Sequence, residues 1–217
     1  MHSNGFFLTD VAGFLGGYYA FIAIMNGIAA LVLWRKKDAT AWALVWSVFA
    51  GIMMIFASLA LSGSKSMVPI LPEGIRGLVN NLSGPVLYTL GTTAILVILY
   101  VFRKFFVQPM VAWSVLNASL LLLGLSMADE NFAAIVMKPD NVPIVGLVYL
   151  LAFFTWVATK QAVVNDERIK QGLPVIEKVN DEKVLVWPDL VYTELICMIA
   201  VSALLLVWAI FLPAPLE

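Results

Sequence analysis

Six long apolar segments, separated by short polar stretches, constrain the fold of this 217-residue chain more than any other feature. A helix needs about 20 apolar residues to cross roughly 30 Å of hydrocarbon. The six segments run over residues 11–34, 41–61, 85–102, 110–128, 142–159 and 190–212. The sequence therefore predicts an all-α, polytopic membrane protein with about six transmembrane helices.

Composition excludes a soluble domain as the main part of the chain. Hydrophobic residues make up 62% of the sequence and charged residues 12%, whereas soluble domains have about 45–50% and 25%. The net charge of −1 gives no indication of a nucleic-acid partner. Residues 1–10 lack the basic region and the cleavage site of a secretory signal, so we expect residues 11–34 to remain as the first helix.

The distribution of Lys and Arg predicts the orientation, because basic residues accumulate in short cytoplasmic loops. With both termini on the outer, positive side, only Lys65, Arg76 and Lys138 of the 13 basic residues face outward. The ten expected to face inward are Arg35, Lys36, Lys37, Arg103, Lys104, Lys160, Arg168, Lys170, Lys178 and Lys183. Six crossings in strict alternation account for this asymmetry.

The loops divide the chain into three expected parts. Residues 1–164 form a five-helix transmembrane bundle, residues 165–188 a charged cytoplasmic connector, and residues 189–217 a last helix with its exit. Gly172 and Pro174 predict the end of any helix that continues out of the fifth span. The charged stretch 161–187 suits a solvated connector or a docking surface for a soluble partner. The outer loop 62–84, broken by Pro69 and Pro72, is compatible with a position on the bilayer surface.

The residues needed for cofactor chemistry are scarce. Buried haem in a membrane bundle needs axial ligands, usually histidines, on facing helices, and the chain has a single histidine, His2. Zinc and non-haem iron sites lack ligands for the same reason. The single cysteine, Cys197, excludes an internal disulfide and lies in an apolar run. We therefore expect no cofactor bound by this chain alone.

Polar residues inside the predicted spans are the candidate functional groups, because ionisable groups are costly in hydrocarbon. Glu194, near the cytoplasmic end of the last helix, suits either a proton relay to a quinone or an interfacial carboxylate that reaches water or Lys183. The amides of Asn26 and Asn117 favour hydrogen bonds across helices over ligand binding.

Two further features concern the outer side and helix packing. Asp129 and Glu130 emerge at the outer face, where we expect simple solvation. Gly13 and Gly17 form a G-x-x-x-G pattern, extended by Ala20, that is typical of close helix packing. We expect this face to pack within the chain rather than to form a dimer.

The last part of the chain resembles a known family. The run Trp187-Pro188-Asp-Leu-Val-Tyr-Thr-Glu-Leu, the apolar helix after it and the closing Pro-Ala-Pro-Leu-Glu resemble the start of the C-terminal part of bacterial cytochrome b, called subunit IV when it is separate. The resemblance covers about residues 180–217. In that family the helix crosses from inside to outside, the direction that the charge count also predicts. The family's Pro-Glu-Trp-Tyr-like motif is absent here, so its quinol-site residues have no counterpart.

The resemblance implies a haem-free subunit of a bc-type quinol:cytochrome c oxidoreductase in the bacterial cytoplasmic membrane. Its partners would be a haem-bearing cytochrome b, further cytochrome c or iron-sulfur subunits, and lipids, with a quinone or lipid cleft at the interface. The expected contact residues are Trp187, Pro188, Ala200 and Ala203 in the last helix, with Gly13 and Gly17 in the first. Two other classes stay open: a stand-alone transporter, and a structural or assembly subunit of another electron-transfer complex.

Overall fold

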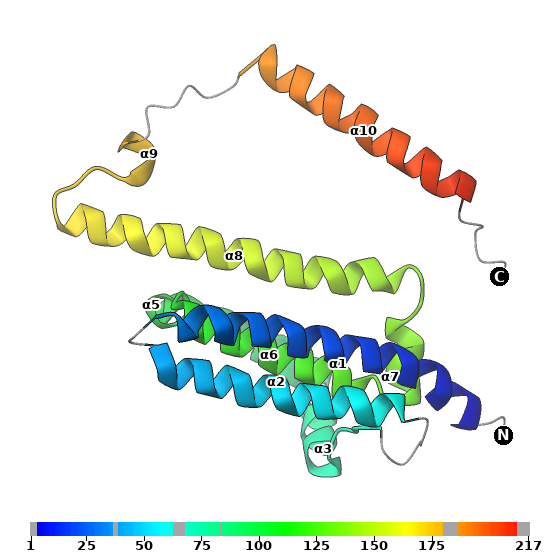
Figure 1. The fold of residues 1–217 in the computed structure, drawn as a ribbon. Helices are drawn as coiled ribbons and strands as arrows, with labels where there is room; N and C mark the ends of the chain where they lie inside the picture. The colour runs from blue at the N-terminus through cyan, green and yellow to red at the C-terminus, as the bar shows by residue number, and fades with distance from the viewer. Residues whose placement is uncertain (1–3, 37–38, 63–67, 83, 180–185, 212–217) are drawn as a thin grey trace. The chain divides into compact units, whose positions relative to one another are not determined.

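The computed structural model describes residues 4–36, 39–62, 68–82, 84–179 and 186–211, and all regular elements in these ranges are helices (Figure 1). They are α1 (Asn4–Trp34), α2 (Thr40–Leu61), α3 (Glu73–Leu82), α4 (Pro85–Val101), α5 (Arg103–Phe106), α6 (Pro109–Ser126), α7 (Glu130–Val136), α8 (Asn141–Lys170), α9 (Ile176–Val179) and α10 (Asp189–Phe211). Five of them, α1, α2, α6, α8 and α10, are long and apolar enough to cross a membrane. The predicted class, an all-helical membrane protein, is confirmed.

The third predicted span is the exception. Helix α4 has 17 residues, which at 1.5 Å per residue gives about 26 Å, slightly less than the hydrocarbon thickness. Helix α3 directly precedes it, and the two together have the length and apolarity of one bent span. The count of six crossings therefore stays a prediction.

The fifth predicted span continues well beyond its expected end at Thr159. Helix α8 has 30 residues and ends at Lys170. Gly172 then takes a φ of 70°, and its N–H donates to the Ile169 carbonyl while the Leu173 N–H donates to the Arg168 carbonyl, at 3.0 and 2.9 Å. This pair of bonds is the Schellman arrangement that closes helices at glycine. The predicted stop is confirmed, but residues 165–170 of the expected connector belong to α8.

The chain divides into two units, Met1–Asp166 and Glu167–Glu217. The second unit holds the last turn of α8, the short α9, and α10. Of the features expected around this unit, Lys183 and the closing run at residues 213–217 lie outside the described residues.

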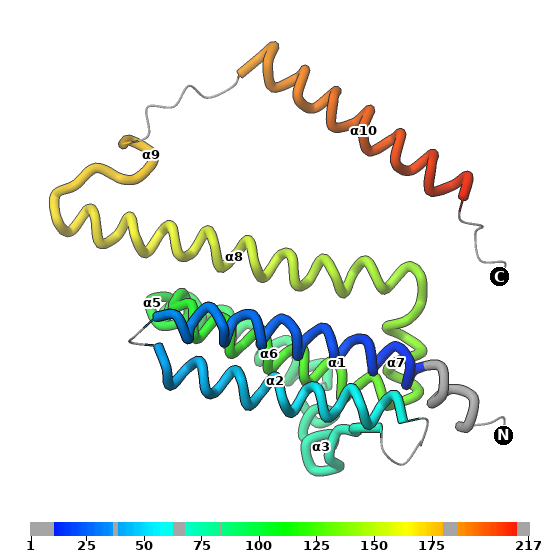
Figure 2. Tube along the Cα trace, in the orientation of Figure 1, coloured from blue at the N-terminus to red at the C-terminus, as the bar shows by residue number. Residues whose placement is uncertain are grey.

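The core of the first unit lies where α1 packs against α2 and α6 (Figures 1 and 2). Its buried residues are Val11, Ala12, Leu15, Tyr19, Ile22, Ala23, Met53, Ala57, Ala60, Val68, Met127 and Ala133. Val68 lies between α2 and α3, and Met127 and Ala133 belong to the region of α7. The core therefore joins three membrane helices to the segments that connect them at one end.

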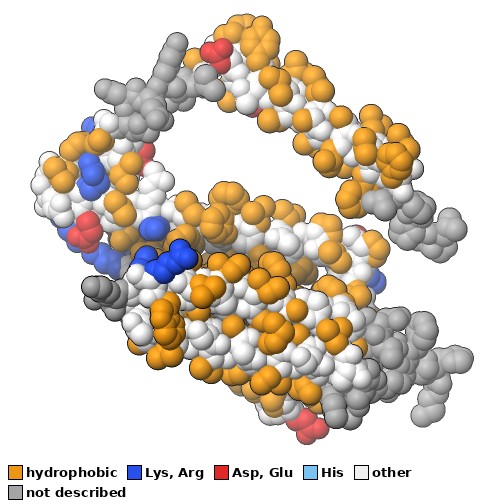
Figure 3. All heavy atoms as spheres, in the orientation of Figure 1, with side chains coloured by type: hydrophobic (Ala, Val, Ile, Leu, Met, Phe, Trp, Pro, Cys, Tyr) orange, Lys and Arg blue, Asp and Glu red, His pale blue; other side chains and the backbone are white. Residues whose placement is uncertain are grey.

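The opposite end of this unit carries basic residues. Helix α1 ends, α2 begins and α5 lies at this end (Figure 1), so Arg35, Lys36, Arg103 and Lys104 are all placed there. Figure 3 shows Lys and Arg side chains over this end and hydrophobic side chains along the neighbouring helices. The side of the membrane on which this end lies stays a prediction.

The expectation that Gly13 and Gly17 pack within the chain stays a prediction. Both glycines are exposed, and a Cβ atom added at either would have no described atom within 4 Å. Close approach occurs at two other glycines. An added Cβ atom at Gly16 of α1 would lie 2.4 Å from the Leu61 side chain, and one at Gly124 of α6 would lie 2.8 Å from Tyr18 and 2.9 Å from Tyr19. The spacing of two glycines marks a flat face but does not determine what lies against it.

Candidate functional site: a polar cluster and an aromatic groove beside α6

Two asparagines from different helices meet in the middle of the first unit. Asn26 on α1 is 0% exposed and Asn117 on α6 is 2% exposed. The Asn26 amide donates to the Asn117 side-chain oxygen at 2.6 Å and to the Ile22 carbonyl at 2.9 Å. The Trp113 indole N–H donates to the Asn26 side-chain oxygen at 3.0 Å, and the Asn117 amide donates to the Trp113 carbonyl at 2.9 Å. The predicted hydrogen bond across helices is confirmed.

About two turns away along α1, a second contact joins the same two helices. The Tyr18 hydroxyl donates to the Leu120 carbonyl at 2.7 Å, and the rings of Tyr18 and Tyr19 lie against Gly124. Only a glycine leaves space for both rings beside α6. The contact between α1 and α6 therefore combines polar bonds with close approach at a small residue, the two means by which helices associate in lipid.

Aromatic rings lead from this cluster to the basic end of the unit. Trp113 meets Trp46 edge to face, with ring centroids 6.5 Å apart, and Trp46 stacks on Trp42 at 6.3 Å. The indole N–H of Trp46 and the hydroxyl of Tyr19 are buried and make no hydrogen bond to any described residue. The Trp46 indole, whose N–H group has no partner in the described part of the chain, therefore lies between the asparagine cluster and Trp42.

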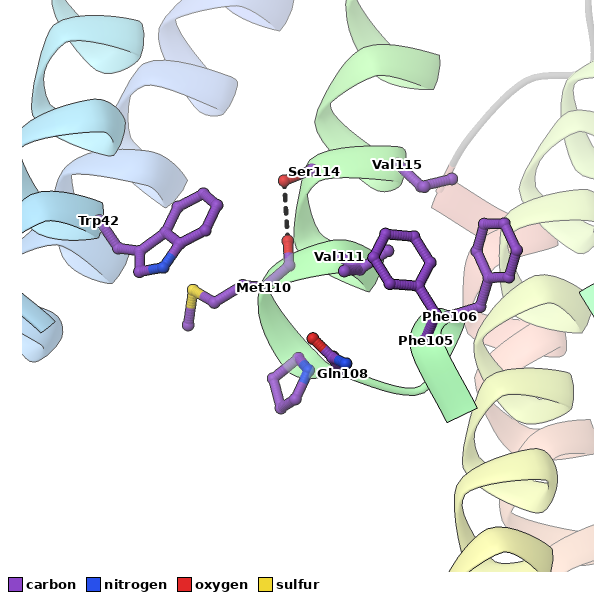
Figure 4. Close-up of a pocket in the computed structure, with 9 residues that line it drawn as sticks. Trp42, Phe105, Phe106, Gln108, Met110, Val111, Ser114 and Val115 are labelled. Atoms are coloured by element: carbon purple, nitrogen blue, oxygen red, sulfur yellow. Dashed lines mark hydrogen bonds between the residues drawn. The ribbon is translucent and has the colours of Figure 1, made fainter. Parts of the chain in front are cut away.

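Trp42 forms one wall of an apolar groove around the first turns of α6 (Figure 4). The groove has a volume of about 650 Å³, is open rather than enclosed, and has a mainly apolar lining. Figure 4 shows Trp42 of α2 facing Met110, and Phe105 and Phe106 of α5 on the other side of the start of α6. The lining residues are Trp42, Phe105, Phe106, Gln108, Pro109, Met110, Val111, Ser114 and Val115.

Charged groups flank the groove beside α5. Arg103 lies at the start of α5, two residues before Phe105, and donates to Asp166 of α8 at 3.0 Å. Its guanidinium also lies 5.2 Å from the ring centre of Tyr100. Because α5 has only four residues, this ion pair helps to fix the groove wall to α8. The groove thus combines an apolar, aromatic interior with a charged margin, which suits an amphiphilic ligand.

The predicted residues of the last helix lie in the second unit. Within that unit Trp187, Pro188, Glu194, Ala200 and Ala203 are all exposed, and Trp187 is 77% exposed. Glu194 lies in the second turn of α10, near the end at which the helix begins. The roles predicted for these residues stay predictions.

Asp129 does more than the solvation expected for it. One of its carboxylate oxygens accepts hydrogen bonds from the backbone N–H groups of Asn131 and Phe132, at 3.0 and 3.1 Å, and so caps the start of α7. Its other oxygen forms an ion pair with Arg76 of α3. Its neighbour Glu130 is exposed in the first turn of α7, as solvation predicts. Asp129 is therefore a structural link between two short helices.

Several site residues escaped the sequence reasoning. The polar character of Asn26 and Asn117 was visible in the sequence, but the indole of Trp113 was not distinguishable from other apolar positions. The groove depends on three segments that are up to 73 positions apart, from Trp42 to Val115. No local pattern brings them together. The pairing of α2 with α5 and α6 is the missing information.

The polar side chains of these sites are hydrogen-bonding groups. The buried polar side chains are amides, an indole and a hydroxyl, and none supplies a general base or an activated nucleophile at neutral pH. In the described ranges no three His, Cys, Asp or Glu side chains gather as metal ligands. Fold and sites together define a polytopic helical membrane protein with a hydrogen-bonded helix pair and an apolar groove.

Comparison of the chain with protein-family models, with curated protein sequences and with solved structures gave no match.

Proposed function

We propose that this chain is a haem-free integral membrane subunit of a bc-type quinol:cytochrome c oxidoreductase in the bacterial cytoplasmic membrane. Its role is to pack against a haem-bearing cytochrome b and to help wall a quinone or lipid cleft. The proposal rests on the sequence and the exposure of helix α10. This helix has the Trp-Pro start and Glu194 of the resemblance, and every one of its residues is exposed within its unit.

Within its own unit α10 has no buried residue, so the helix that packs on it lies outside that unit. In lipid no hydrophobic effect drives helices together, so close van der Waals contact and hydrogen bonds must do so. Ala200 and Ala203, one turn apart, give α10 a small-residue face where another backbone fits closely. The proposed contact is between this face, with Trp187 and Pro188 at its start, and a haem-bearing helix bundle.

The aromatic groove supports the second part of the proposal. A quinone or a phospholipid has a polar head and a long apolar tail. Trp42, Phe105 and Met110 offer apolar surface for a tail, and the Gln108 amide and the basic end of the unit offer polar groups for a head. Glu194 is the proposed proton relay on the quinone side of α10. The chain itself has no proposed catalytic residue.

The proposed topology has six crossings with both termini on the outer side. In a Cys197→Ser background, a cysteine placed at Gln171 should be protected from impermeant thiol reagents added to intact cells, whereas a cysteine at Glu217 should react. The opposite pattern would invert the topology. Reaction at both positions would place them on the same side of the membrane, which means an even number of crossings between them, and α10 would then not cross.

Haem association tests the function itself. Membranes gently solubilised in digitonin should give a blue-native band that contains this chain and stains for haem. After separation of the subunits, the pyridine haemochrome spectrum of this chain should show no haem, because its only histidine, His2, lies outside every predicted span. Stoichiometric haem on the separated chain, or a wild-type chain that never migrates with haem, would overturn the proposal.

A further inference from the structure

Helix α3 is amphipathic in an unusually regular way. Its apolar residues Ile75, Leu78, Val79 and Leu82 follow the spacing i, i+3, i+4, i+7 that places side chains on one face of a helix. These four side chains are 37–57% exposed. The described part of the chain therefore leaves this apolar stripe largely uncovered.

The opposite face of α3 is polar, with Glu73 and Asn80 near its centre and Arg76 on its flank. With 10 residues, the helix is about 15 Å long and cannot cross a bilayer alone. A short helix with one apolar and one polar face fits the boundary between two solvents.

Three connections fix α3 at the level of the ends of the membrane helices. Two residues separate its end at Leu82 from the start of α4 at Pro85. Its Arg76 is paired with Asp129, three residues beyond the end of α6. On its other side, the chain between α2 and α3 is held in the core by Val68, which is 5% exposed.

We propose that α3 is an interfacial helix that lies in the plane of the membrane, with its apolar stripe on the acyl chains of one phospholipid leaflet and Arg76–Asp129 as its protein anchor. In the topology proposed above this is the outer leaflet. A lipid surface is the occupant because, at the ends of three membrane helices, headgroups and the first acyl carbons are what surrounds the protein. The inference does not depend on the electron-transfer function.

The energetic argument favours lipid over water. Full burial of an aliphatic side chain such as leucine is worth about 1.5–3 kcal/mol relative to exposure. Four such side chains on one stripe give α3 a clear preference for the apolar side of the interface. Arg76 stays at the polar level because its partner carboxylate caps α7 there.

Two labelled positions on opposite faces of α3 test the proposal. In full-length Cys197→Ser protein, Leu78→Cys and Asn80→Cys are each labelled with the environment-sensitive fluorophore NBD, and the protein is placed in phosphatidylcholine nanodiscs. Quenching is measured with doxyl-labelled phosphatidylcholine and with aqueous iodide. We expect the label at position 78 to be quenched several-fold more by the doxyl lipid than the label at position 80, and iodide to give the reverse order.

Each other pattern overturns the proposal. Iodide quenching at both positions would place α3 in water, and doxyl quenching at both would place it inside the hydrocarbon as part of a bent span with α4. Protection of position 78 from both quenchers would mean that a protein surface covers the stripe. If Leu78→Cys protein does not fold, Ile75→Cys on the same face takes its place, with the same expected order.

Discussion

Helices α1 and α10 are both apolar along their length, but they differ in how much of each is buried within its own unit. Helix α1 has fully buried residues on the side that faces α2 and α6, among them Leu15, Tyr19 and Asn26. Helix α10 has no buried residue within its unit. In lipid, apolarity places a helix in the membrane but does not determine its neighbours. Within the first unit, a few polar and small residues mark the contact between α1 and α6.

The particular residues are visible at the contact between α1 and α6. Asn26 and Asn117 pair there, and Gly124 admits the rings of Tyr18 and Tyr19. On α10, the comparable small residues Ala200 and Ala203 are present without a contact inside their unit. The first set makes contacts within the first unit, and the second set is the face that we propose for a partner.

The largest expected effect is from filling the space at Gly124. Gly124→Leu would force both tyrosine rings away from α6 and break the bond from Tyr18 to Leu120, so we expect the free energy of unfolding to fall by about 3 kcal/mol, the upper part of the range for overpacked cores. Titration of the detergent-solubilised protein with sodium dodecyl sulfate, followed by circular dichroism, measures this change.

Gly146→Leu on α8 is the matched control, because a Cβ atom there would have no described atom within 4 Å. We expect its unfolding free energy to equal that of the wild type within error. Equal loss in both variants would mean that the effect comes from the glycine backbone and not from the contact between α1 and α6.

A smaller loss is expected when the polar cluster is broken. Asn26→Leu removes a hydrogen bond to Asn117 and leaves the Trp113 indole without its acceptor. Interhelical bonds in membranes are worth about 0.6 kcal/mol on average and about 1–2 kcal/mol in model peptides, so we expect a loss of about 1–2 kcal/mol in the same titration.

Thr92→Val on α4 is the comparison for Asn26→Leu, since the Thr92 hydroxyl bonds only to carbonyls of its own helix, those of Tyr88 and Thr89. Its loss should be near zero. An equal loss of unfolding free energy in Thr92→Val and Asn26→Leu would mean that the hydrogen bond between α1 and α6 stabilises the protein no more than a hydrogen bond within one helix.

The smallest expected change in unfolding free energy distinguishes the two roles of Asp129, the ion pair with Arg76 and the cap of α7. Asp129→Asn keeps an oxygen that caps α7 but loses the charge that pairs with Arg76, and exposed ion pairs are worth about 0.2–1 kcal/mol. Asp129→Ala also loses the cap, which is worth about 1 kcal/mol. We expect the alanine variant to be less stable than the asparagine variant by about 1 kcal/mol. Equal stability of the two variants would contradict the capping role.

Much of the fold was predictable because the membrane imposes it. Apolar length located the spans, and Gly172 located the end of α8. The fifth span was predicted to end at Thr159, and α8 continues to Lys170, because apolarity reports where a helix leaves lipid and not where its backbone hydrogen bonds stop. Residues 160–170, with Lys160, Glu167 and Arg168 among them, are good helix formers in water.

The contacts between helices were predictable only where polar side chains lie inside the predicted spans. An amide inside a span needs a hydrogen-bond partner, so the bond across helices at Asn26 and Asn117 was predicted. Gly124 lies among leucines with no distinguishing neighbour, and its importance comes from tyrosines more than 100 positions away. The pair Gly13 and Gly17 has the stronger local pattern but no described contact within the chain. Packing in lipid depends on the partner surface, which a single helix sequence does not contain.

The central claim is that α10 joins this chain to a haem-bearing partner, and a double substitution on its small face tests it most directly. Ala200→Leu with Ala203→Leu should leave membrane insertion intact, because leucine favours insertion, while it prevents close approach of a partner helix. Ala209→Leu is the control, since nine residues at about 100° each place it on the opposite face from Ala200.

Blue-native electrophoresis with haem staining reads the result. We predict that the double variant reaches the membrane in normal amount but no longer migrates with haem, whereas the Ala209→Leu variant migrates with haem as the wild type does. A double variant that still migrates with the haem band would contradict the account, because α10 would then not be the contact that holds the subunit.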